Sequence, residues 1–176
     1  MEIYKTFWRR VAALIIDGLV MAPVTGMILF MTWRGMSFGA YLFWTVLSTV
    51  VSCAYWIGMH GRYGQTLGKM ATGVKVLKMD GQPLTYGVAA LRYFPFIFIG
   101  LISMVGTLNY LSGLGEITFQ SLTGAPKWSQ WINHVWMIAQ LITVLSNPMR
   151  RAIHDFIAGT KVVVIQKMVP PPVAQT

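Results

Sequence analysis

The chain has 176 residues, of which 55% are hydrophobic and only 11% are charged. Soluble domains carry about 25% charged residues, so this composition excludes an ordinary soluble domain and indicates an integral membrane protein. Because basic residues commonly flank membrane spans, we assign the net charge of +9 to membrane topology and expect no nucleic-acid partner.

The first apolar segment, residues 11–31, is long enough to cross a bilayer as a helix. Arg9 and Arg10 precede it, and Asp17 lies inside it. A carboxylate at the centre of a span costs about 2.5–3.5 kcal/mol, and by default it marks a candidate functional site. Asp17 also interrupts the apolar run and no small-residue cleavage site follows, so we expect the segment to be retained rather than removed as a signal peptide.

A second span is predicted at residues 38–58, and a glycine-rich, basic loop follows at 59–92. Within the loop, residues 65–72 favour a short interfacial helix that stops at Gly73. Residues 74–79 are strand-like, as is the β-branched run 161–165, which is too short to span a membrane as a helix. We expect these two runs to pair, because an isolated strand leaves its backbone groups unsatisfied.

Two further spans are predicted at residues 91–111 and 128–145. The predicted fold is therefore an all-α, four-helix transmembrane bundle with a small cytoplasmic β element. Residues 1–167 form one membrane domain in this interpretation. The last segment, 168–176, contains three consecutive prolines and is expected to be a disordered tail.

Basic residues are concentrated on one side of the predicted spans. Twelve of the 14 Lys and Arg residues lie in the N-terminal segment, the 59–92 loop or the C-terminal segment. The other two loops hold only Arg34 and Lys127. Since cytoplasmic loops carry an excess of Lys and Arg, both termini are predicted to be cytoplasmic.

The sequence contains no recognisable enzyme motif. His60, His134 and His154 lack the spacing of a zinc hydrolase, and Met70 after Lys69 breaks the match to a phosphate-binding loop. The single cysteine, Cys53, cannot form an intramolecular disulfide. We therefore predict that the protein is not an enzyme, with no catalytic, cofactor-binding or metal-binding residues.

Two of the five acidic residues are candidates for a site at the cytoplasmic side. Asp17 has two low-cost states in a membrane, because it can be protonated or can pair with a cation from another segment. Asp155 follows the last span among basic residues, so the two aspartates are expected to share one polar cluster. The interpretation stays open between a structural connection and a binding or proton-relay site. The candidate residues are Arg10, Asp17, Arg92, Arg151, His154 and Asp155.

Three motifs resemble those of the RDD family, multi-pass membrane proteins named for one arginine and two aspartates. Arg10 and Asp17 match the arginine that starts the first span and the aspartate within it. Residues 64–76 are similar to the motif after the second span, and Asp155 matches the third name-giving residue. The resemblance implies a multi-pass membrane protein, and transport, including cation/proton exchange, is the usual proposal for the family.

We therefore expect a protein of the bacterial inner membrane with a transport-related role, as a cation/proton exchanger or small-solute transporter that uses its intramembrane carboxylates. The alternative is a non-transporting scaffold or accessory subunit whose Arg/Asp cluster is structural. The expected partners are the lipid bilayer, anionic lipids at the cytoplasmic face and a second copy of the chain in a homo-oligomer.

Overall fold

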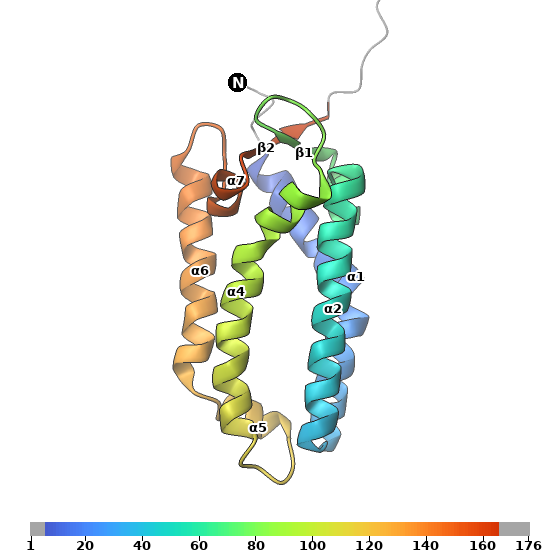
Figure 1. Cartoon of the computed structure of the whole chain (residues 1–176), viewed down its shortest axis with the longest axis vertical. Coiled ribbons are helices and arrows are strands. Elements are labelled where there is room, and N and C mark those ends of the chain that lie inside the picture. Colours follow the sequence, from blue (N-terminus) through green and yellow to red (C-terminus); the bar gives the residue numbers. More distant parts are fainter. Residues whose placement is uncertain (1–5, 166–176) are drawn as a thin grey trace, which may run out of the picture.

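The structure, a computed structural model, describes residues 6–165. Four long helices run side by side along the long axis of the molecule (Figure 1). They are α1 (Phe7–Arg34), α2 (Phe38–Tyr63), α4 (Tyr86–Leu111) and α6 (Lys127–Ser146). Each contains one of the four predicted spans and extends past it at one or both ends.

Three of these helices, α1, α2 and α4, are long and apolar enough to cross a membrane. Helix α6 is shorter and carries Asn133, His134 and Gln140. Large apolar side chains such as Phe43, Phe98 and Val135 are exposed on the outer surface. A surface of this kind is suited to lipid rather than to water, so the fold supports a membrane protein with at least three candidate spans.

One end of the molecule carries four short elements, one of which contains His154 and Asp155 (Figure 1). These elements are α3 (Leu67–Thr72), β1 (Val74–Lys78), α7 (Ile153–Ile157) and β2 (Thr160–Val164). We call this the sheet end. The other end carries α5 (Phe119–Thr123) and is closed by an isolated bridge between Met36 and Ile117.

The two strands pair antiparallel, with Val76 opposite Val162 and Lys78 opposite Thr160. Val74, Val76 and Val162 are fully buried and pack with Leu84 and Ala89 in one apolar cluster. The predicted pairing of residues 74–79 with 161–165 is therefore confirmed, apart from a shift of one residue at the strand ends. It attaches the segment after α6 to the segment after α2.

The short helix predicted at residues 65–72 is confirmed as α3. Thr66 is its N-cap, and its hydroxyl accepts a hydrogen bond from the backbone N–H of Lys69. Gly73 ends it with φ of +68°, a left-handed conformation that favours glycine. The predicted tail at 168–176 lies outside the described residues.

Candidate functional site

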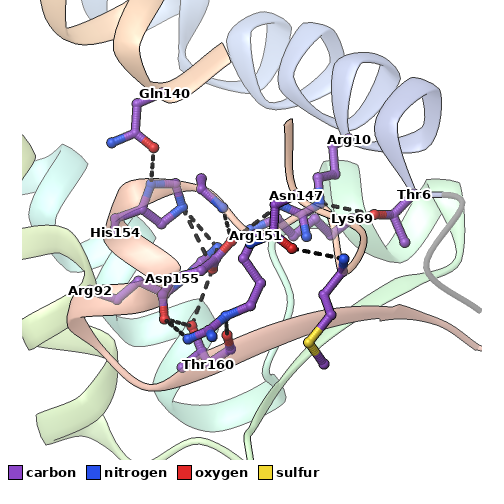
Figure 2. A network of polar contacts seen from close by, with 12 residues as sticks. Thr6, Arg10, Lys69, Arg92, Gln140, Asn147, Arg151, His154, Asp155 and Thr160 are labelled. Atoms are coloured by element: carbon purple, nitrogen blue, oxygen red, sulfur yellow. Dashed lines mark hydrogen bonds and ion pairs between the residues drawn. The ribbon is translucent and has the colours of Figure 1, made fainter. Parts of the chain in front are cut away.

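Asp155 lies at the centre of a buried ionic network at the sheet end (Figure 2). Its Oδ2 accepts from Nη1 of Arg10 at 3.1 Å, and its Oδ1 accepts from Nε and Nη2 of Arg92 at 2.9 and 2.7 Å. The carboxylate also accepts from the N–H of Ala152 and the hydroxyl of Thr160. Asp155 thus connects α7 with α1, α4 and β2.

The charge state of this network follows from its contacts. Burial alone would raise the pKa of Asp155, but the guanidinium groups of Arg92 and Arg10 hold that pKa well below its ordinary value. Burial and the charge of Arg92 lower the pKa of His154 to about 3. Asp155 is therefore ionised and His154 neutral at physiological pH.

Arg151 contacts the backbone of this region rather than a carboxylate. Its Nε donates to the carbonyl of Thr160 at 3.0 Å, and its Nη2 donates to the carbonyl of Asp155 at 3.0 Å. Its guanidinium also lies 4.1 Å from the ring centroid of Phe156. Arg151 thus connects α7 to β2.

Asp17 has a separate set of partners, all of them uncharged. Its Oδ1 accepts from the hydroxyl of Tyr55 at 2.7 Å and from the N–H of Gly68 at 2.8 Å, and its Oδ2 accepts from the hydroxyl of Thr66 at 2.6 Å. The sequence left two states open for Asp17, protonation or pairing with a cation from another segment. The N-terminus of α3 takes the place of such a cation, because its unpaired N–H groups attract a negative charge.

The contact between α1 and α3 depends on Gly68. A Cβ atom at this position would collide with the carbonyl oxygen of Ala13 and lie 2.9 Å from Cγ of Asp17. Only glycine allows the two helix backbones to approach this closely. Gly68 therefore lets the start of α3 come close enough to α1 for Thr66 and the N–H of Gly68 to donate to Asp17.

His60 and Lys69 form a further polar contact near the Asp155 network. Nζ of Lys69 lies 2.6 Å from Nε2 of His60, and Nη1 of Arg92 lies 3.1 Å from the same nitrogen. Nδ1 of His60 donates to the carbonyl of Trp56 at 2.8 Å, which leaves Nε2 as the acceptor. Burial, followed by repulsion from Arg92, holds the pKa of Lys69 well below its ordinary value.

These groups surround a cavity of about 450 Å³. Its polar side chains are those of Arg10, Asp17, His60, Lys69, Arg92, Gln140 and His154. Its apolar walls come mainly from α1, α4 and α6, with Leu14, Phe96 and Leu141 as examples. Within residues 6–165, no group of three His, Cys, Asp or Glu side chains is placed to bind a metal ion.

The model of the RDD family matches residues 4–159. The chain belongs to the RDD family. It is also 28% identical over 171 residues to the uncharacterized membrane protein YteJ of Bacillus subtilis (strain 168), covering 91% of this chain and 80% of that protein. No solved structure matches the chain.

In this RDD protein, the three name-giving residues are divided between two sets of contacts. Arg10 and Asp155 bind one another, together with Arg92, and His154 contacts Arg92. Asp17 belongs to the Tyr55–Thr66–Gly68 set, although its side chain also lines the cavity that Arg10, Arg92 and His154 line. The expected direct cluster of two aspartates closed by arginines is thus two neighbouring networks.

Sequence reasoning missed several residues that the structure brings to this RDD site. They are Tyr55, His60, Lys69 and Gln140, which lie on α2, α3 and α6. Lys69 was available as a signal, because it is the lysine inside the family-like motif at residues 64–76. In the sequence it is one of the basic residues of the 59–92 loop, whereas in the structure its Nζ lies 2.6 Å from Nε2 of His60.

Proposed function

We propose that this RDD protein is a four-span membrane protein that transports a small solute through the cavity at its sheet end. The observation that carries the proposal is the cavity of about 450 Å³, which combines charged groups with apolar helix walls. Its volume falls in the range of small-molecule sites, about 300–1,000 Å³. A cavity of this kind at one end of a membrane helix bundle is suited to bind a small solute that crosses the membrane.

The pairing of β1 with β2 supports a fourth crossing. The chain leaves β1, crosses in α4 and must return to the same side for β2 to pair. Helix α6 is the remaining long helix between them, and its 20 residues have a length of about 30 Å, the thickness of the hydrocarbon core. Its exposed face is apolar, with Val135, Ile138 and Ile142 as examples.

The distribution of charge supports a cytoplasmic sheet end. Among residues 6–165, Arg34 and Lys127 lie towards the α5 end. The other basic residues belong to the sheet end: Arg9, Arg10, Arg62, Lys69, Lys75, Lys78, Arg92, Arg150, Arg151 and Lys161. By the positive-inside rule this end faces the cytoplasm.

The orientation is tested with single cysteines in a Cys53→Ala background. Asp80 lies in the exposed turn after β1 and Ser112 in the exposed loop after α4. In intact cells, a membrane-impermeant maleimide should label Ser112→Cys, and it should label Asp80→Cys after permeabilisation. Labelling of both from one side would contradict the four-span topology.

The contacts of the two aspartates favour a positioning role for them over direct ion binding. All oxygens of Asp17 and Asp155 already accept hydrogen bonds from protein donors. The cavity-lining group best suited to respond to a proton is Lys69, since burial disfavours its charged form.

Transport is tested in proteoliposomes by imposing pH and solute gradients. Leu141 lines the cavity and Leu145 lies one turn away on α6, outside the lining, and both are about half exposed. Leu141→Trp should fill the cavity and abolish flux, and Leu145→Trp should leave flux unchanged. A stably inserted Leu141→Trp protein with wild-type flux would contradict the proposal, and an absence of flux for any gradient would favour the scaffold alternative.

A further inference from the structure

We propose that the cavity binds the phosphate group of an anionic membrane lipid, held by Arg10 on α1 and Gln140 on α6. This inference goes beyond the proposed function by assigning a lipid ligand to the same cavity, and it concerns binding alone. It rests on three observations. Two donors have no acceptor, the carboxylates next to the cavity already accept hydrogen bonds from the protein, and the walls of the cavity are apolar.

Two of the residues that line the cavity carry one buried donor each, and these donors have no hydrogen-bond acceptor among residues 6–165. They are Nη2 of Arg10 and Nε2 of Gln140. Gln140 is 8% exposed, and leaving a buried donor unpaired costs about 1–3 kcal/mol. Both side chains are held by their other atoms, because Nε of Arg10 donates to Thr6 and Oε1 of Gln140 accepts from His154.

The orientation of the Gln140 amide follows from His154 (Figure 2). Nη2 of Arg92 lies 3.0 Å from Nε2 of His154, and a guanidinium can only donate, so Nε2 is the acceptor. The proton of the neutral ring is therefore on Nδ1, which lies 2.8 Å from Oε1 of Gln140. The amide nitrogen of Gln140 consequently has no freedom to flip, and its two N–H groups stay available as donors.

The carboxylates next to the cavity offer little to a cation. Asp17 already accepts three hydrogen bonds, and both oxygens of Asp155 contact arginines or backbone N–H groups. The available groups are the donors of Arg10 and Gln140, with the positive charge of Arg92 and the amine of Lys69 close by. A guest with several acceptor oxygens and a negative charge satisfies these donors, as a phosphate does.

The walls favour a lipid as the source of that phosphate. Helix α1 packs on α2 and α3, and α6 packs on α4 and α7. The cavity is lined by α1, α4 and α6, and α1 and α6 make no extensive contact with each other. Leu14, Met137 and Leu141 line it and are about half exposed on the surface that faces the membrane. An acyl chain fits along this rim while the headgroup phosphate lies at the basic sheet end, near headgroup depth.

The test is a binding titration of the purified protein in detergent, followed by native mass spectrometry and by the shift in melting temperature. The probes are dioctanoyl phosphatidylglycerol, dioctanoyl phosphatidylcholine with the same chains, and inorganic phosphate. We expect saturable binding of phosphatidylglycerol, with much weaker binding of the other two. Equal binding of the two lipids would overturn the assignment of an anionic ligand, and tighter binding of inorganic phosphate would overturn the lipid source.

Variants then locate the site. Gln140→Leu should weaken phosphatidylglycerol binding by about tenfold or more, because one hydrogen bond to a charged group is lost. Gln130→Leu makes the same change at an exposed position of α6 and should bind as wild type. If Gln140→Leu does not fold, Leu141→Trp, which blocks the cavity from an exposed position, replaces it. Wild-type affinity in the cavity variant that folds would overturn the site, whether or not the protein shows flux in vesicles.

Discussion

Replacing Asp155 by Asn should destabilise the protein more than any other single change of a carboxyl group. The substitution keeps the shape of the side chain and removes the charge that pairs with Arg10 and Arg92, whose side chains are 14% and 8% exposed. Leaving buried charges without a partner typically costs about 3–5 kcal/mol. At about 2–4 °C per kcal/mol for a chain of this size, the melting temperature should fall by roughly 6–20 °C.

The measurement is thermal unfolding in detergent, followed by tryptophan fluorescence. Asp80→Asn is the matched control, because Asp80 is exposed and its Oδ1 accepts one backbone hydrogen bond that Asn can also accept. It should change stability by less than about 0.5 kcal/mol. Adding Arg92→Gln to Asp155→Asn should recover part of the loss, since one of the two unpaired charges is then removed. A loss below about 1 kcal/mol for Asp155→Asn would refute the argument, because the arginines would then need no counter-charge.

Three further substitutions test the other contacts by thermal unfolding. Gly68→Ala should cost about 1–3 kcal/mol or more by overpacking α3 against α1, whereas Gly87→Ala, which has open space around it, should be neutral or slightly stabilising. Thr66→Val removes the N-cap and a donor to a carboxylate and should cost about 2–3 kcal/mol, whereas Thr123→Val in exposed α5 should not change stability. An unfolded histidine binds a proton below about pH 6.5, but folded His154 does so only near pH 3. His154 alone should therefore lower wild-type stability by about 1.4 kcal/mol per pH unit from pH 6.5 towards pH 3, and His154→Asn should reduce the measured slope by about that amount. Equal stability of the paired glycine or threonine variants, or an unchanged pH slope, would contradict the corresponding contact.

The sequence predicted the parts of the fold that depend on local composition. Apolar length marked α1, α2 and α4, and β-branched residues marked both strands. The pairing of the strands was also predictable, because neither run had another partner that would satisfy its backbone. Gly73 was recognisable as the end of α3 for an equally local reason, since it is a glycine directly after a helical run.

The partners of Asp17 were not predictable, because they depend on how distant segments pack. Tyr55, Thr66 and Gly68 lie 38, 49 and 51 residues further along the chain. A search for opposite charges favours arginine as the partner of a carboxylate in a membrane. It overlooks the unpaired N–H groups of a short helix, which carry partial positive charge without any basic side chain.

The role of Gln140 was not predictable, because it depends on the orientation of two other side chains. Its amide is fixed by His154, whose tautomer is fixed in turn by Arg92. No sequence pattern encodes these two contacts, which connect three distant residues. The position of Lys69 was not predictable either, because its contact with His60 depends on the close approach of α3 to α1 that Gly68 permits.

These contacts together explain how α1 and α6, two of the helices that line the cavity, are held in position. Helix α1 is attached to α3 through Asp17 and to α7 through the Arg10–Asp155 pair. Helix α6 is attached to α7 through Gln140 and His154. Both α1 and α6 are therefore attached to α7, while they make no extensive contact with each other. A ligand that accepts hydrogen bonds from both Arg10 and Gln140 adds the missing connection between α1 and α6, and its binding is thereby coupled to the spacing of the two helices.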